Sequence, residues 1–197
     1  MVRNCNGCTV CCEGLLVIDS NGIKASLDKP CVYLSCNVGC NIYSNRPIDP
    51  CDSFQCLWLT DAQHMTPEMK PSKTKVIVQE RLVQGWHLPV LAAVAKNKES
   101  LDLEWENIKS IAKAKGIFAV ALAYSNSKKD QNKKTMNIFG DAKFAETMKT
   151  LFDNQVAYRT RLIRAKSLKP AFVFAANVHR SHCPSPCMRW QRNHTAC

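Results

Sequence analysis

The chain has 197 residues, of which 46% are hydrophobic and 22% are charged, and its formal net charge is +11. This composition is typical of a globular protein and excludes a disordered or collagen-like chain. The length suffices for one compact domain or two small ones with a real core. Apolar runs are too short to span a bilayer, and the first residues lack the apolar core of a secretory signal. We therefore expect a cytoplasmic protein with no membrane segment.

The charge is distributed unevenly along the chain. Residues 1–64 carry a net charge of −2, residues 65–197 carry +13, and no Asp or Glu follows Asp153. A solvated, solubilising surface and a binding surface for an acidic protein or a nucleic acid are both consistent with the basic half.

Residues 1–64 are expected to form a loop-rich module that its cysteines organise. Pro30, Pro47 and Pro50 argue against long helices there, and the apolar run at 15–18 predicts a short strand. A linker is expected at 66–72, where two prolines occur.

Beyond this segment, patterns of both helix and strand occur. A Val- and Ile-rich strand is predicted at 75–83, and a short buried helix at 88–95. The clearest helix is predicted at 100–115, with Ser100 as its N-cap, acidic residues early, basic residues late and Gly116 as its stop.

The remaining elements follow in order. A buried strand is predicted at 117–125, a basic loop at 127–134 and a returning strand at 135–139. A second amphipathic helix is predicted at 141–154, and its inward side chains are Phe144, Met148, Leu151 and Phe152. A further strand is predicted at 171–176.

The predicted fold class is α+β. It consists of a cysteine-rich, metal-stabilised module (1–64), a small basic domain with a mixed sheet (65–180) and a flexible tail (181–197).

Nine of the twelve cysteines lie within the first 56 residues. In a reducing compartment such clustered thiols are more often metal ligands than disulfides. Cys5, Cys8 and Cys11 are spaced by three residues, which is typical of thiolate sites for zinc or an iron–sulfur cluster. The doublet Cys11-Cys12 is unusual, because neighbouring side chains in extended backbone point to opposite faces. It indicates either two metal ions, each held by four thiolates, or two corners of one cluster.

The next thiols occur in the phrases Cys31-Val-Tyr-Leu, Cys40-Asn-Ile-Tyr43-Ser-Asn-Arg46-Pro47 and Cys51-Asp-Ser-Phe54-Gln-Cys56. Together with the initial C-x2-C-x2-C-C run, they resemble the YkgJ-type cysteine-cluster proteins, which are described as zinc- or iron-chelating domains. The resemblance covers about residues 4–58. It implies the following metal ligands: Cys5, Cys8, Cys11, Cys12, Cys31, Cys40, Cys51 and Cys56.

The chain departs from this pattern at three points. Cys36 is an additional thiol, three residues rather than two separate Pro47 from Cys51, and Asp52 stands where a basic residue is commoner. Tyr43 and Arg46 lie between two implied ligands. A guanidinium can donate hydrogen bonds to thiolate sulfurs, so both side chains are expected to lie against the bound metal site.

The primary hypothesis is a metal-binding protein that chelates Zn²⁺ or an iron–sulfur cluster through these thiolates. Two alternatives remain open. One is a metal-dependent enzyme that carries out redox chemistry or modifies a protein or peptide. The other is a nucleic-acid-binding regulator in which zinc has a structural role. No phosphate-binding loop, dinucleotide-binding motif or H-E-x-x-H sequence is present.

Two weaker signals lie outside the N-terminal cysteine cluster. Cys183, Cys187 and Cys197 lie near three histidines in the last residues, but two prolines interrupt the C-x3-C pair, which favours a tail over a zinc site. His64 and His87 have no motif around them and are expected to be packing or surface residues.

Overall fold

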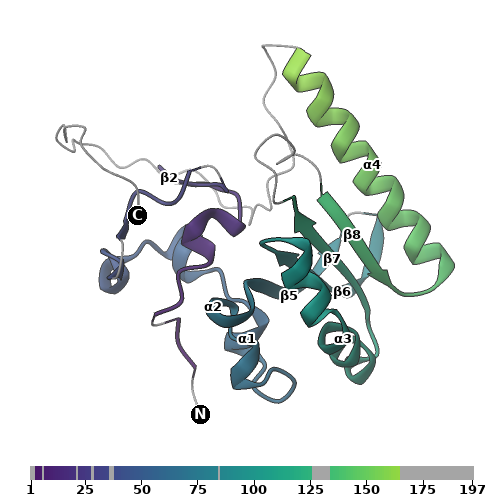
Figure 1. Ribbon diagram of the computed structural model, residues 1–197, viewed down its shortest axis with the longest axis horizontal. Helices are drawn as coiled ribbons and strands as arrows, with labels where there is room; N and C mark the ends of the chain where they lie inside the picture. The colour runs from purple at the N-terminus through teal and green to yellow at the C-terminus, as the bar shows by residue number, and fades with distance from the viewer. Residues whose placement is uncertain are drawn as a thin grey trace.

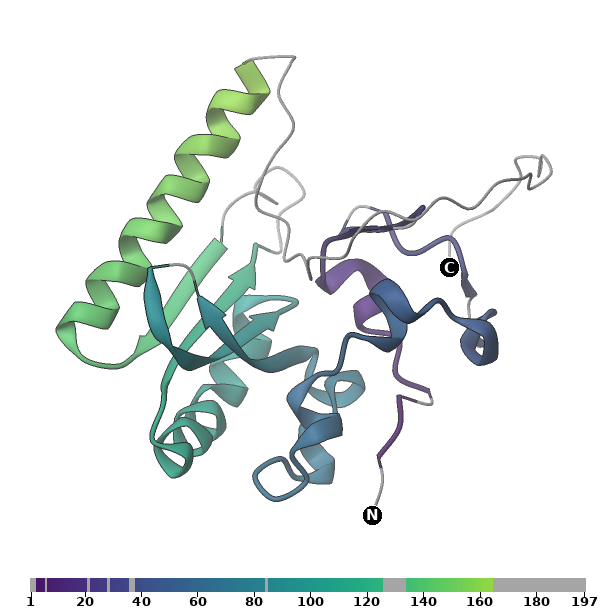
Figure 2. The same ribbon diagram turned by 180° about the vertical axis from the view of Figure 1, so that it is seen from behind.

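The computed structural model describes residues 3–5, 7–20, 22–27, 29–35, 38–83, 85–125 and 134–164, with side chains up to residue 153. The expected strand at 171–176 and tail at 181–197 lie outside these residues, as does the expected loop at 127–134 except for Lys134, which starts a strand. In both ribbon views the cysteine-rich N-terminal part, coloured purple to blue, lies beside a teal-to-green part that is built on a β-sheet (Figures 1 and 2).

The cysteine-rich part consists of short elements joined by turns. They are the π-helical turn η1 (Cys11–Leu15), β1 (Ile18–Ser20), β2 (Ile23–Ala25), β3 (Leu34–Ser35), β4 (Gly39–Cys40), the 3₁₀ turn η2 (Tyr43–Asn45) and the π-helical turn η3 (Ile48–Asp52). β1 pairs with β2 and β3 pairs with β4, both antiparallel. The strand expected at 15–18 starts only at Ile18, because Leu15 closes η1 and is buried in the core with Leu16.

The expected linker at 66–72 is instead part of the folded core. The chain forms α1 (Leu57–Thr60), the 3₁₀ turn η4 (Pro67–Met69) and α2 (Pro71–Thr74). Met69 and Pro71 are buried. Each proline stands at the first position of its turn, where an N–H would have no intrahelical partner, so it starts a helix as readily as it marks a linker.

A mixed four-stranded sheet confirms the α+β class. Its strands lie in the order β5 (Val76–Val83), β6 (Trp86–Ala95), β7 (Phe118–Tyr124) and β8 (Lys134–Phe139). The central pair β6–β7 is parallel, and the two outer pairs are antiparallel. The helix α3 (Lys98–Lys115) connects the parallel strands, and α4 (Ala142–Arg164) follows β8.

The prediction of a helix at 88–95 is wrong, because these residues belong to β6. From Val90 onward this strand pairs with β5 on one edge and with β7 on the other, and all its residues from Val90 to Ala95 are buried. A strand that is buried on both faces shows no alternation of apolar and polar residues, so its sequence resembles that of a buried helix. Pro89 precedes the pairing with β7, where its missing N–H is tolerated.

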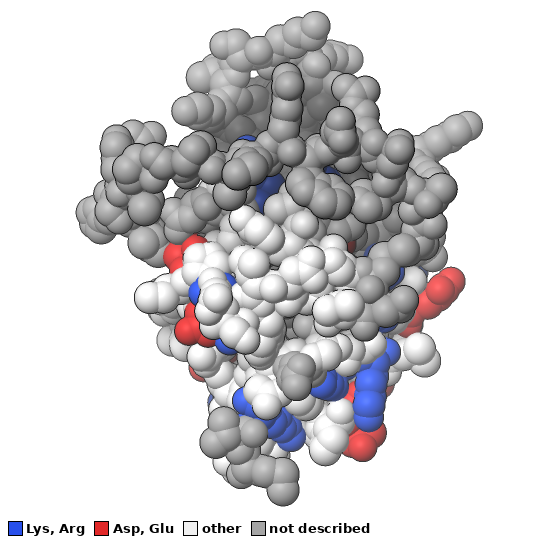
Figure 3. Space-filling model, turned by 90° about the vertical axis from the view of Figure 1, so that its left-hand side faces the viewer, with Lys and Arg blue, Asp and Glu red and all other residues white. Residues whose placement is uncertain are grey.

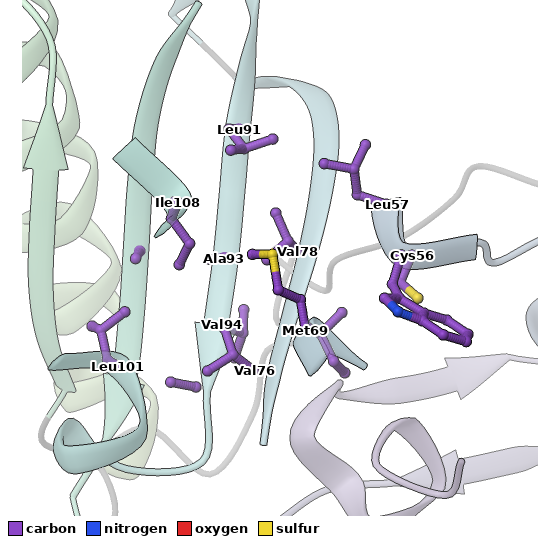
Figure 4. Packing of buried hydrophobic residues seen from close by; sticks show 14 of the residues in the cluster. Cys56, Leu57, Met69, Val76, Val78, Leu91, Ala93, Val94, Leu101 and Ile108 are labelled. Carbon is purple, nitrogen blue, oxygen red and sulfur yellow. The ribbon is translucent and has the colours of Figure 1, made fainter. Parts of the chain in front are cut away.

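The two faces of the sheet pack against different partners. Leu91, Ala93 and Ala119 belong to the larger core, to which α3 contributes Leu101 and Ile108. Figure 4 shows this packing. On the opposite face, side chains of the sheet pack against side chains of α4 in a smaller cluster. The sheet residues in this cluster include Trp86, Val90, Phe118 and Val120. Phe144 and Met148 of α4 are buried there, as the sequence predicts.

The helix α3 begins two residues earlier than predicted. Its N-cap is Asn97, whose side-chain oxygen accepts a hydrogen bond of 2.8 Å from the Ser100 N–H. Ser100 is therefore the third residue of the helix rather than its cap. Asn and Ser are similarly effective N-caps, and the sequence alone does not choose between two of them three residues apart. Gly116 ends the helix in the left-handed conformation, as predicted.

A group of charged side chains connects the loop after α1 to the sheet and to α3. The Lys115 ammonium lies 2.9 Å from an Asp61 carboxylate oxygen and 3.0 Å from one of Glu80. The His64 ring nitrogen Nδ1 lies 2.9 Å from the Asp61 carboxylate. Burial by itself raises the pKa of Asp61, but the hydrogen bonds from Lys115 and His64 outweigh it and lower the pKa to about 2.

We expect the variant Lys115→Met to raise the pKa of Asp61 from about 2 toward its ordinary value. At pH 7 the variant should lose about 1–2 kcal/mol of unfolding free energy. Because the folded-state pKa lies below the unfolded one, this stabilisation is complete above about pH 4 and is lost as the pH falls through the folded-state pKa. NMR titration of the Asp61 carboxyl carbon and urea unfolding at pH 7 measure the two effects.

The control for this variant is Lys98→Met. Lys98 pairs with Asp102 on the surface of α3, where both side chains are largely exposed. Its loss should cost less than about 0.5 kcal/mol. An ordinary titration midpoint for Asp61 in the unmodified chain, near pH 4, would show that the pairing with Lys115 does not persist in solution.

Candidate metal centre

The first cysteines of the chain lie on two successive turns. The Cys8 N–H donates a hydrogen bond of 2.7 Å to the Cys5 carbonyl, which closes the first turn, with Gly7 at a φ of 72°. The next turn is η1, which starts at Cys11 and is braced by a 2.7 Å hydrogen bond from the Thr9 hydroxyl to the Glu13 carboxylate. These turns place the cysteine side chains without any regular helix or strand.

Backbone pairing brings the doublet to the later cysteines. The Cys31 N–H donates to the Cys12 carbonyl at 2.9 Å. Cys40 lies opposite Leu34 in the β3–β4 ladder. Cys51 lies in η3, which a hydrogen bond of 2.5 Å from the Ser20 hydroxyl to the Asp49 carboxylate ties to β1. Three segments that are distant in sequence are thus joined around Cys12.

The packing of the side chains divides six of the cysteines into two groups. Cys56 is part of the large core, and Cys8 and Cys11 pack against that core. Cys31 instead belongs to a separate small cluster with Ile23 and Ala25, and Cys12 and Cys51 pack against this second cluster. Cys11 and Cys12 are neighbours in the chain but belong to different clusters.

The largest electrostatic interactions between the thiols follow the same division. Burial raises the pKa of Cys11 well above its ordinary value, and the negative charges of Cys56 and Cys8 raise it further, followed by those of Cys12 and Cys5. Burial also raises the pKa of Cys56, and Cys5 and Cys8 add to this effect. We call this group the first thiol set, which consists of Cys5, Cys8, Cys11 and Cys56.

The other group is centred on Cys12. Burial raises the pKa of Cys12 to about 12, together with the charges of Cys31, Cys40 and Cys51 and a smaller contribution from Cys5. The pKa of Cys51 is likewise raised by burial and then by Cys31 and Cys40. We call this group the second thiol set, which consists of Cys12, Cys31, Cys40 and Cys51.

The chemistry of both sets suits a thiophilic metal. All eight cysteines are free thiols. Four thiolates are the donor set of structural zinc sites and of iron–sulfur clusters, and a bound cation reverses the mutual repulsion that raises these pKa values. The Leu59 N–H donates to the Cys56 carbonyl at 2.9 Å, and backbone hydrogen bonding from Leu59 and Trp58 lowers the pKa of Cys56 against the effect of burial.

The described side chains are gathered but do not converge on a point. Among the residues that the structure describes, no group of three or more His, Cys, Asp or Glu side chains is arranged to hold a metal ion. Coordination would therefore require the four sulfurs of a set to draw together. Each set fits a metal in the type and number of its donors, and the final geometry would form on binding.

Arg46 and Tyr43 lie together, but the guanidinium is directed to a carboxylate. Nε and Nη2 of Arg46 both donate to Asp52 Oδ1, at 3.1 and 2.7 Å, and the guanidinium carbon lies 4.4 Å from the centre of the Tyr43 ring. The hydrogen bond to Asp52 is the main cause that raises the pKa of Arg46. The charge of Arg46 lowers the pKa values of both Cys5 and Cys51, against the effect of burial.

The positive charge of Arg46 therefore favours the thiolate of Cys5 in the first set and that of Cys51 in the second. Asp52, at which the chain departs from the resembling pattern, holds the guanidinium in place.

Arg3 is a further residue at the candidate site, and no sequence motif indicates it. Its Nη1 donates to the Trp58 carbonyl at 2.8 Å, and its Nη2 donates to the Met65 carbonyl at 2.7 Å. The guanidinium carbon also lies 4.8 Å from the centre of the Trp58 ring. Cys5 follows Arg3 by two residues and Cys56 precedes Trp58 by two, so these contacts bring two members of the first thiol set together. No sequence pattern predicts them, because the acceptors are backbone carbonyls far along the chain.

The other residues considered from the sequence have simpler places. His64 pairs with Asp61, and His87 stacks on Trp86 with ring centres 5.7 Å apart. Cys36 and the cysteines at positions 183, 187 and 197 lie outside the described residues. No helix in the described part of the chain is long and apolar enough to cross a membrane. No protein-family model, curated protein or solved structure matches the chain.

Proposed function

We propose that this protein binds metal through two separate centres, each formed by four cysteine thiolates. The division of the eight free thiols into two sets of four supports this proposal: packing separates six of them, and electrostatic interactions add Cys5 to the first set and Cys40 to the second. Four thiolates complete a tetrahedral site, so each set would be full without a ligand from solvent. Membership of the YkgJ-type cysteine-cluster family remains part of the proposal.

Zinc is the metal that we propose. It needs no redox partner, accepts four thiolates and stabilises short loop-rich segments that lack a large core of their own. The elements that carry the second thiol set are strands and turns of two to five residues, which fits this role. An iron–sulfur cluster in either set is the alternative, because iron–sulfur clusters are also held by four thiolates.

Anaerobic purification of the full chain, followed by elemental analysis and an absorption spectrum, tests the proposal. We expect about two zinc ions per chain and no visible absorbance. Replacement of zinc by Co²⁺ should give the intense ultraviolet and visible bands of tetrahedral cobalt thiolates, which report the donor atoms directly.

Two other outcomes would change or contradict the proposal. Iron and acid-labile sulfide, with a brown colour that bleaches on reduction, would assign iron–sulfur clusters instead of zinc. A folded chain that retains no metal and takes up neither Zn²⁺ nor Co²⁺ would show the proposed function to be wrong.

A further inference from the structure

The two thiol sets have different surroundings. The first set lies against the main core of the protein. Cys56 is 6% exposed and stands at the start of α1. Its cluster includes side chains from β5, β6 and α3, so the sulfur of Cys56 is in contact with the same core that supports the sheet. Figure 4 shows Cys56 beside Leu57 and Met69, on the α1 side of this core.

The segment that carries the other members of the first set is also held from outside the set. Arg3 fixes the chain before Cys5 through its two hydrogen bonds to the carbonyls of Trp58 and Met65. The Arg3 guanidinium carbon and the Lys70 ammonium lie 4.8 and 5.3 Å from the centre of the Trp58 ring, whose Nε1–H donates to the Thr66 carbonyl at 3.0 Å. Opening the first set would therefore disrupt contacts of the core as well as bonds to sulfur.

The second set lies at the periphery. Its cluster has three buried members, Ile23, Ala25 and Cys31. Three apolar residues close in sequence to Cys31, Cys40 and Cys51 are exposed: Val32 is 67% exposed, and Val38 and Ile48 are each 77% exposed. Figure 3 shows the side of the molecule on which β2 lies in Figure 1; the middle of the described surface is uncharged, and acidic and basic residues lie to its left, to its right and below it.

We infer that the second thiol set is an exchangeable metal centre, whereas the first set retains its ion as part of the fold. This inference rests on the proposed function. Local opening is easiest where few buried contacts must break, and solvent access to a metal site is controlled by its apolar shell. Among the residues that the structure describes, the second set packs against a cluster with three buried members, and Val32, Val38 and Ile48 near it are exposed.

The exchange itself is a ligand substitution without redox change. An incoming thiolate or chelator donor binds the ion, one Zn–S bond to the second set breaks, and the released cysteine sulfur takes up a proton at neutral pH. Repetition of this step removes the ion and leaves four thiols.

The test uses the zinc-loaded full chain and the chromogenic chelator 4-(2-pyridylazo)resorcinol. We expect release in two phases of equal amplitude, with the second phase slower by about tenfold or more. Alkylation with iodoacetamide after the fast phase, followed by peptide mass spectrometry, identifies the freed cysteines. The expected labels are on the second set, namely Cys12, Cys31, Cys40 and Cys51.

Two variants test which thiol set gives the fast phase and which gives the slow phase. Cys40→Ser should fold, bind about one zinc ion and show only the slow phase. Arg3→Gln leaves every thiol in place but removes the contacts that hold the first set, so it should accelerate the slow phase about threefold to tenfold without altering the fast one. Lys24→Gln is the control for Arg3→Gln, because Lys24 forms an exposed pair with Asp19. It should leave both phases unchanged.

Several results would overturn the inference. They are a single phase for both ions, alkylation of the first set before the second, or a Cys40→Ser chain that fails to fold. An unchanged slow phase in Arg3→Gln would overturn the holding role of Arg3. Any of these results leaves two bound ions and hence the proposed function intact, whereas a chain without bound metal overturns both.

Discussion

Serine substitutions at the adjacent residues Cys11 and Cys12 are expected to remove different metal ions. Cys11→Ser should lose the ion of the first thiol set, and Cys12→Ser should lose that of the second. Each variant should retain about one zinc ion per chain. The reason is that Cys11 packs against the main core with Cys56, whereas Cys12 packs in the small cluster of Cys31. Elemental analysis of the purified variants measures the stoichiometry.

The two variants should differ in stability. Loss of the ion beside the core in Cys11→Ser should reduce the free energy of unfolding by about 3 kcal/mol or more. Cys12→Ser should cost less, because its cluster is small and peripheral. Each variant is the matched control of the other, since the same atom is exchanged at neighbouring positions. If both variants lose both ions, the thiols form one polynuclear site rather than two centres.

Gly14→Ala is expected to be one of the most destabilising single substitutions in the chain. Gly14 has a φ of 92°, a conformation that disfavours any side chain. A Cβ there would overlap the backbone carbonyl of Ser26 and lie 2.8 Å from the Leu27 nitrogen. Backbone cannot yield as a side chain does, so η1 must move and carry Cys11 and Cys12 with it. We expect a loss of about 4 kcal/mol or more and reduced binding of both ions.

Gly22→Ala is the matched control for this effect. Gly22 has a φ of 78° but no atom within 4 Å of an added Cβ. It therefore incurs only the conformational cost of the left-handed region, about 1–2 kcal/mol. Urea unfolding and the zinc content of the two variants distinguish the cost of a side chain at positive φ from the cost of its overlap with Ser26. Equal effects in the two variants would contradict the packing of Gly14 against Ser26.

Several elements could be predicted because their signals are local. The acidic start, basic end and Gly116 stop of α3 lie within the helix itself, and the prediction was wrong only in the choice of cap. The apolar runs of β5 and β7 and the amphipathic start of α4 were confirmed in the same way. These signals depend on neighbours a few residues apart, which is the range over which propensity and capping act.

The errors concern residues whose environment is set from a distance. β6 was mistaken for a helix because two neighbouring strands bury it on both sides. The segment at 66–72 was interpreted as a linker because its prolines suggest a break, yet Met69 lies in the core. In both cases the deciding contacts come from other parts of the chain, so the local pattern is ambiguous.

The sequence by itself determined the proposed chemistry of the candidate site, because the clustered cysteines of the first 56 residues are the thiols that would serve as metal donors. It also raised the alternative of two ions through the doublet at Cys11. Only the tertiary structure decided which thiols belong together. Cys56 and Cys11 both pack in or against the large core, and the Cys31 N–H donates a hydrogen bond to the Cys12 carbonyl. The contacts of Arg3 with two distant carbonyls were likewise decided by the fold. Backbone acceptors and burial have no signature in the residue types, so such pairings emerge only when the chain is folded.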